Sequence, residues 1–156
     1  MSLILFFSLI FPAHNEEHRL PPSLGAVHAY LARQTFASEI IVVENGSSDK
    51  TFESAQGFAA QHPNLRVIQN DWRGKGLAIQ RGIKEAQGEY LFLCDADLSM
   101  PIAEISKFIP PQLQKVDIAI ASREAPGAVR YDEPYYRHFT GRGFNILIRL
   151  LVLPTL

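Results

Sequence analysis

The sequence has little of what disulfide-bonded, membrane-spanning or nucleic-acid-binding proteins are built from. It contains one cysteine in 156 residues, Cys94, which excludes an internal disulfide and a cysteine-based zinc site. Residues 1–13 are apolar but fall short of the ~20 residues that span a bilayer, and they lack the positively charged start of a signal peptide. The formal net charge is −1, so the chain offers no basic tail for nucleic acid.

What is present is the composition of a globular protein, 47% hydrophobic and 20% charged, in a length that suits one domain. Short apolar runs alternate with segments of helical spacing, and this alternation predicts an α/β fold with a largely parallel sheet. Cys94 falls in one of the apolar runs and is expected to be a buried structural thiol. The expected strands are residues 3–11, 40–43, 65–68, 90–94 and 116–121. The expected helices begin at Pro21, at Ser48 or Asp49, at Gly76 and at Pro101.

An acidic pair, Asp95-Ala96-Asp97, directly follows the fourth apolar run. The run itself is short and unbroken, and it predicts a central strand that is buried on both faces. Open α/β sheets bind ligands beyond the carboxyl ends of their strands, where both carboxylates would lie. Oxygen ligands of this kind suit a hard divalent cation, and such a cation commonly accompanies a phosphate group. An isolated Asp-x-Asp more often only solvates a loop, so the interpretation depends on the other strand ends.

Polar residues also follow three of the other expected strands. Asn15 and Glu16 follow the first strand, Glu44 the second and Arg123 the fifth. Taken alone, each has a structural explanation in a helix cap or a solvated loop, and turn chemistry accounts for residues 45–51 without requiring Glu44. Because the carboxyl ends of parallel strands fall along one edge, these groups would share a crevice. Such a crevice has the groups needed to hold a nucleotide diphosphate through a metal ion.

A basic segment with two glycines, Arg73-Gly74-Lys75-Gly76, precedes the third expected helix. It has neither the P-loop spacing nor the Gly-x-Gly-x-x-Gly dinucleotide fingerprint. The glycines would let the backbone approach a ligand closely, and a helix N-terminus beside Lys75 favours an anion. A solvated glycine turn explains the segment equally well.

In their order and spacing, several segments together resemble the family 2 glycosyltransferases, which have the GT-A fold, a Rossmann-like sandwich. The segments are residues 11–17, 43–51, 74–76 with 81–82, and 93–99. Within the family, the closest resemblance is to the dolichyl-phosphate or polyprenyl-phosphate glucosyl- and mannosyltransferases. The marks of that subgroup are Leu98-Ser99, Ser122-Arg123 and residues 141–147.

The resemblance implies residue roles. Asp97 would ligate Mg²⁺ or Mn²⁺ to the diphosphate, and Asp95 would contact the ribose or the metal. Glu44 would sit near the base, where the family usually has aspartate, and Lys75 would lie near the base or the phosphates. The other residues expected around the nucleotide are Pro12, Ala13, Asn15, Glu16 and Gly74, with Arg123 at the diphosphate and Arg130, Arg137 and Arg142 as further candidates.

The implied activity is transfer of a hexose from a nucleotide sugar to a polyprenyl or dolichyl phosphate, with inversion at the anomeric carbon. UDP-glucose is favoured over GDP-mannose, and the protein is expected at the cytoplasmic face of a membrane. The chain is expected to form one nucleotide-sugar-binding domain truncated at its C-terminus. Its core would be residues 1–123, and residues 124–156 would supply a basic loop and an incomplete apolar helix on the acceptor or membrane side.

Two alternatives remain from the sequence. A nucleotidyltransferase would also use carboxylates, a metal and a basic loop, but it would carry a glycine-rich basic loop after the first strand. Here that loop, residues 12–17, is acidic and free of glycine. The second alternative is a truncated domain that binds nucleotide or a partner protein without turnover.

Overall fold

The computed structural model describes residues 5–70, 72–113 and 115–122, together with positions 141, 143, 144, 146 and 148. The chain divides into two compact units, residues 1–116 and residues 117–156. The first unit holds the sheet and the helices that flank it. In the second unit, the described positions between 141 and 148 are helical, and Phe144 and Ile146 are exposed there.

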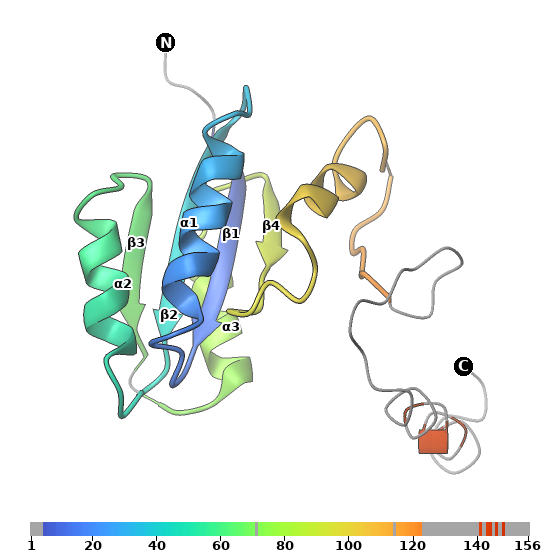
Figure 1. The fold of residues 1–156 in the computed structure, drawn as a ribbon. Coiled ribbons are helices and arrows are strands. Elements are labelled where there is room, and N and C mark those ends of the chain that lie inside the picture. Colours follow the sequence, from blue (N-terminus) through green and yellow to red (C-terminus); the bar gives the residue numbers. More distant parts are fainter. Residues whose placement is uncertain are drawn as a thin grey trace. The chain divides into compact units, whose positions relative to one another are not determined.

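The first unit is built on a four-stranded parallel sheet with the order β3-β2-β1-β4 (Figure 1). The four strands occur where the apolar runs predict them. Their bounds are β1 Leu5–Ala13, β2 Ala37–Glu44, β3 Leu65–Gln69 and β4 Tyr90–Leu93. In the register, Ala13 lies opposite Glu44, and Glu44 lies opposite Gln69. The strands therefore finish along a common edge, from which the loops that follow them emerge.

Helices cover both faces of the sheet, so the unit has three layers (Figure 1). The helices are α1 Leu20–Leu31, α2 Thr51–Ala59, α3 Lys75–Glu85 and the 3-10 helix η1 Ile102–Phe108. On one face, α1, α2 and η1 bury a large cluster that includes Leu24, Phe11 and Ile40. On the other face, α3 packs through Ala78 against Ile10 and Val43. The predicted α/β fold with a mostly parallel sheet is confirmed.

The prediction that the fourth strand is central and buried on both faces is wrong. β4 is the last strand in the sheet order, and its side chains alternate between half-buried and exposed. Leu91 is 42% exposed and Leu93 is 48% exposed. The reason is that α3 contacts β1 and β2 and leaves this face of β4 without a helix among the described residues.

The prediction of a fifth strand over residues 116–121 is also wrong. No strand is assigned between residues 115 and 122, and the side chains of Ile118 and Ile120 are 86% and 84% exposed. The β-branched alternation of this segment fits a pleated surface, but a strand also needs a neighbouring backbone to pair with. Within the described residues, this segment has no such neighbour.

Two glycines allow close packing against β1. A Cβ atom on Gly82 would lie 2.3 Å from Ile10 Cγ2, so α3 can approach β1 only because this position lacks a side chain. A Cβ atom on Gly88 would lie 2.7 Å from the backbone nitrogen of Ser8. The Gly88 N–H instead donates to Ser8 Oγ, and Ser8 Oγ donates to the buried carboxylate of Glu39.

Candidate functional site

A cleft of about 290 Å³ opens where β1, β2 and β4 end. It is lined by Pro12, Ala13, His14, Glu16, Asn45, Lys75, Asp95, Ala96 and Asp97. The convergence of strand ends expected from the sequence therefore occurs for β1 and β4. Of the other predicted site residues, Asn15, Glu44 and Gly74 lie beside the cleft without lining it. Arg123, Arg130, Arg137 and Arg142 lie outside the described residues.

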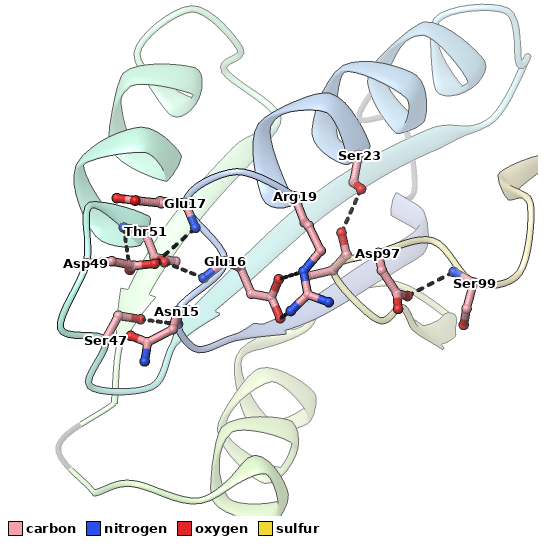
Figure 2. Close-up of polar contacts among 11 residues, drawn as sticks. Asn15, Glu16, Glu17, Arg19, Ser23, Ser47, Asp49, Thr51, Asp97 and Ser99 are labelled. Carbon is pink, nitrogen blue, oxygen red and sulfur yellow. Dashed lines mark hydrogen bonds and ion pairs between the residues drawn. The ribbon is translucent and has the colours of Figure 1, made fainter.

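The acidic loop that follows β4, residues 95–97, is held in place by a hydrogen bond from α1. Ala96 is buried, and its carbonyl accepts a hydrogen bond of 2.6 Å from Ser23 Oγ (Figure 2). Because Ala96 points inward, Asp95 and Asp97 on either side of it are exposed. Asp97 Oδ1 accepts a hydrogen bond of 3.0 Å from the Ser99 N–H, which closes a short turn. The loop thus presents two carboxylates on a fixed backbone.

Asp95 already has a cation beside it. Lys75 Nζ, from the first residue of α3, lies 2.6 Å from Asp95 Oδ1. The side chains of the pair are 67% and 56% exposed, so water screens the attraction between them. Lys75 can reach this position because Gly74 adopts a φ of 150° at the start of the helix. The cleft therefore holds an exposed positive charge next to its acidic loop.

Glu16 has a cation of its own, which the sequence analysis did not identify. Arg19 Nε lies 2.7 Å from Glu16 Oε2, and an Arg19 terminal nitrogen donates to Glu16 Oε1 at 2.9 Å (Figure 2). The Glu16 side chain is 16% exposed against 60% for Arg19. This two-point contact fixes the orientation of the carboxylate and balances its charge. The spacing of three residues between Glu16 and Arg19 was the sequence signal that could have predicted this ion pair.

A network of hydrogen bonds fastens the loop after β1 to the loop after β2 (Figure 2). Asn15, at a φ of 55°, accepts from the Ser48 N–H through its side chain, and its own N–H donates to Ser47 Oγ. The Glu16 N–H donates to Thr51 Oγ1 at 2.7 Å. Asn15 is therefore a loop-fastening residue in this structure, and its side-chain oxygen is engaged by Ser48.

Asp49 belongs to the same network and acts near the start of α2. Its Oδ1 accepts from the Thr51 N–H at 3.0 Å, and its Oδ2 accepts from the Glu17 N–H at 3.2 Å. Desolvation acts to raise the pKa of Asp49. The hydrogen bonds from Thr51 and Glu17 outweigh this effect and lower the pKa below the usual 3.8. The prediction that Ser48 or Asp49 caps α2 is wrong, because Lys50 occupies the N-cap position and makes no side-chain capping bond. Asp49, one residue earlier, accepts from the Thr51 N–H, whereas Ser48 bonds to Asn15.

Glu44 supports the turn that follows β2, so the expectation that turn chemistry does not involve it is wrong. The residue is 4% exposed, and its Oε1 accepts a short hydrogen bond from the Ser47 N–H. This bond stabilises the turn that begins at Asn45 and Gly46. Glu44 does not line the cleft, and the predicted contact with a base is not tested by this structure.

Asn45 is the second residue that the sequence analysis missed, because its turn-forming role seemed sufficient. It is 6% exposed, and its Oδ1 accepts from the Gly74 N–H at 3.0 Å and lies 3.4 Å from Asn70 Nδ2. Its carbonyl oxygen lies 3.1 Å from His14 Nδ1. Asn45 therefore ties the loop before α3 to the ends of β1 and β2. Only long-range contacts reveal this role.

Cys94 lies at the base of the acidic loop and is buried, as expected from the apolar run around it. Burial raises the pKa of its thiol from 9.0 to about 12, and the negative charge of Asp95 acts in the same direction. A protonated, buried thiol is a poor nucleophile and a poor metal ligand. Cys94 is therefore a packing residue.

The residues of the cleft fit a divalent cation of the magnesium type. Such ions are commonly bound by one or two carboxylates together with phosphate oxygens, and Asp95 and Asp97 supply two carboxylates. No cluster of three or more acidic, histidine or cysteine ligands occurs among the described residues, so the protein alone would not enclose the ion. A phosphate-bearing ligand would have to complete the coordination.

Comparison with known proteins places the chain in a family. The profile named "Glycosyl transferase family 2" matches residues 8–155. The chain belongs to glycosyltransferase family 2. A dolichyl-phosphate beta-glucosyltransferase (ALG5C) of Trichomonas vaginalis is 35% identical over 94% of this chain and 47% of its own length. A dolichol-phosphate mannosyltransferase of Pyrococcus furiosus is 33% identical over 94% of this chain and 41% of its own length. The chain thus spans less than half the length of these two relatives.

Solved structures agree with this placement at the level of the fold. The structure of S. aureus TarS residues 1–349 in complex with UDP is 30% identical and has a TM-score of 0.51, covering 60% of this chain and 28% of TarS. Mannosyltransferase PcManGT from Pyrobaculum calidifontis, in complex with GDP-Man and Mn²⁺, is 24% identical with a TM-score of 0.54, covering 67% of this chain and 32% of that protein. The expected GT-A fold of this family 2 chain is confirmed. Within the described residues, no helix combines the length and apolar character that a membrane span needs.

Proposed function

We propose that this family 2 chain binds a nucleotide sugar, with UDP-glucose favoured over GDP-mannose, and transfers its hexose to a dolichyl or polyprenyl phosphate at the cytoplasmic face of a membrane. The observation that carries the proposal is the pair of exposed carboxylates, Asp95 and Asp97, in one cleft with Lys75. The names of the two relatives, a dolichyl-phosphate beta-glucosyltransferase and a dolichol-phosphate mannosyltransferase, support the acceptor class.

The chemistry of such a transfer suits the charges of the cleft. As the bond between the sugar and the nucleoside diphosphate breaks, negative charge grows on the diphosphate and must be stabilised. A divalent ion bound beside Asp97 would supply that stabilisation as a Lewis acid. Lys75 would leave Asp95 and turn its ammonium group towards the phosphate oxygens. The acceptor phosphate is already an anion at neutral pH, so attack on the sugar needs no dedicated base. Direct displacement would invert the anomeric centre.

Isothermal titration of the chain with UDP and with GDP, each with and without Mn²⁺, tests the nucleotide part of the proposal. We expect UDP to bind more tightly than GDP, and we expect Mn²⁺ to strengthen binding. Asp97→Ala should remove the effect of Mn²⁺, whereas the matched control Asp117→Ala, an exposed acid in the other unit, should not. The absence of binding to both nucleotides would sink the proposal.

Transfer itself is tested with labelled UDP-glucose and GDP-mannose and short-chain dolichyl phosphate in detergent. Formation of a glucosyl lipid by the chain supports the complete proposal. Nucleotide binding without transfer would reduce the proposal to a donor-binding domain whose acceptor site needs sequence beyond this chain.

A further inference from the structure

The only tryptophan of the chain, Trp72, is 74% exposed. It belongs to the loop between β3 and α3, three residues before Lys75, which lines the cleft. An indole ring is a large apolar surface, and leaving it in water forgoes the gain in free energy that burial would bring. Neither the sheet nor the flanking helices require an aromatic residue at this position.

The loop that carries Trp72 is fastened to the cleft wall. Asn70 Nδ2 donates to the Trp72 carbonyl oxygen at 2.6 Å, and the Gly74 N–H donates to Asn45 Oδ1 at 3.0 Å. Arg73 donates through Nε and a terminal nitrogen to the Gly46 carbonyl at 3.1 and 2.8 Å. Both Arg73 bonds use its guanidinium to hold the loop itself. The backbone that carries Trp72 is therefore fixed beside Asn45, which lines the cleft.

The geometry of the cleft indicates which part of a nucleotide would reach this rim. The carboxylates Asp95 and Asp97 follow β4, whereas Asn45 and Gly46 follow β2, on the other side of β1 in the sheet order. A diphosphate held beside Asp97 would therefore have its nucleoside directed along the sheet edge, either towards Asn45 and Trp72 or away from the described cleft. Among the described residues, Asn45 lines the cleft on the first of these sides.

The size of the cleft points the same way. Pockets that enclose a small ligand typically measure about 300–1,000 Å³, and this cleft of about 290 Å³ lies just below that range. It has room for the diphosphate and part of the ribose of a nucleotide sugar, so the base would extend over the rim. An exposed aromatic ring at that point offers a stacking surface.

We propose that the indole ring of Trp72 stacks on the nucleobase of the donor. The inference rests on the proposed nucleotide-sugar function and adds a base-binding residue that lies outside the acidic motif. Every base has a π face, so stacking strengthens nucleotide binding without selecting one base. The choice between a uridine and a guanosine donor must then come from hydrogen-bonding groups.

Because the chain has one tryptophan, its fluorescence reports on Trp72 alone. We expect the exposed ring to emit as a water-accessible indole, and we expect saturating UDP or GDP with Mg²⁺ to quench that emission. Inorganic pyrophosphate with Mg²⁺ occupies the same diphosphate site but carries no base, so it should leave the emission unchanged. Vesicles of anionic phospholipid should not shift the emission to the blue.

Two substitutions make the test quantitative by calorimetry. Trp72→Ala should weaken UDP binding about 10-fold and leave pyrophosphate binding unchanged, because only the base contact is lost. Trp72→Phe should restore most of the affinity. Leu77→Ala is the matched control, since Leu77 is also an exposed apolar residue near this loop, at 47% exposure, and should bind UDP like the parent.

The possible outcomes separate this inference from the proposed function. If the parent chain binds neither nucleotide, both fail. If nucleotide binds but does not quench the emission, and Trp72→Ala binds UDP like the parent, the stacking role fails alone. A blue shift with vesicles in place of nucleotide quenching would also overturn it, and would assign Trp72 to a membrane surface. Quenching by nucleotide together with a selective loss of UDP affinity establishes the contact.

Discussion

At the scale of single residues, the three carboxylates that line the cleft are not equivalent. Asp95 is paired with Lys75 at 2.6 Å, and Glu16 is held at two points by Arg19. Among the residues that the structure describes, Asp97 instead has one partner, the Ser99 N–H, and forms no ion pair. Its remaining oxygen lone pairs can meet a cation without breaking an ion pair. The two halves of the Asp-x-Asp motif thus differ in the cost of binding a metal, because a ligand role for Asp95 requires Lys75 to move.

Lys75→Ala tests whether this lysine acts on the ligand or on the fold. The ion pair is well exposed, so we expect its loss to change the free energy of unfolding by less than about 1 kcal/mol in urea denaturation. Affinity for UDP with Mg²⁺ should fall clearly, because a positive charge beside the phosphates is removed. Lys84→Ala, which removes an exposed lysine of the same helix, serves as control. A large loss of stability with unchanged affinity would contradict the assignment.

The acidic motif could be predicted because consecutive residues after an apolar run define it. Asn45 could not, because its role depends on Gly74 and Asn70, which folding brings close. Arg19 could have been found from its spacing of three residues from Glu16, but that spacing alone does not show that the pair forms. Glu44 illustrates the same limit. Its position at the end of β2 was predicted correctly, but its carboxylate turns back to the Ser47 N–H in the structure, which no sequence pattern specifies.

At the scale of elements, α3 is the helix whose placement matters most for the cleft, since its first residue is Lys75. Its close approach to β1 depends on Gly82, which faces Ile10. Any side chain at position 82 would push α3 away from β1 and displace Lys75 relative to Asp95. The requirement is steric, because Gly82 lies inside a regular helix where the backbone has no need of glycine.

Gly82→Ala should therefore destabilise the protein by about 1–3 kcal/mol, as expected for overpacking of a tight core. Urea denaturation followed by circular dichroism measures the change. Gly25→Ala is the matched control, because Gly25 lies within α1 and an added Cβ would meet nothing within 4 Å. That substitution should stabilise by about 0.5–1 kcal/mol, since alanine is the better helix former. Equal effects at both positions would contradict the packing argument.

The elements themselves were predictable to different degrees for a physical reason. Strands β1 to β3 and the three α-helices carry local patterns that agree with their burial. Apolar content alone could not distinguish an edge strand from a central one, so β4 was wrongly predicted to be a central strand buried on both faces. Residues 116–121 have the composition of a strand but lack a paired neighbour among the described residues, and pairing is a property of the sheet.

At the scale of the whole molecule, the cleft forms only when the elements of the first unit are packed together. Its walls come from the ends of β1 and β2, from the first residue of α3 and from the loop after β4, so the sheet and the α3 layer both contribute. Cys94 lies directly beneath the acidic loop and is buried. Access to this thiol therefore requires the core under the cleft to open.

Cys94 should react with a thiol reagent such as DTNB very slowly in the native protein at pH 8 and rapidly in urea. The reason is that burial raises the pKa of the thiol to about 12, so the reactive thiolate is scarce as well as shielded. The stability gained from keeping the thiol protonated is present below pH 9.0 and is lost as the pH rises towards 12. Native labelling as fast as in urea would show that β4 is not held against the core.

The strand order also has a consequence for protein synthesis. β1 is made first, but it lies between β2 and β4, and the contact between Ser8 and Gly88 joins residues 80 positions apart. At roughly 5–20 residues per second, a ribosome needs roughly 4–16 s to supply the second neighbour of β1. During that interval one edge of an apolar strand is open to pairing with other chains. The order of the sheet thus makes the growing chain dependent on protection until its acidic loop has emerged.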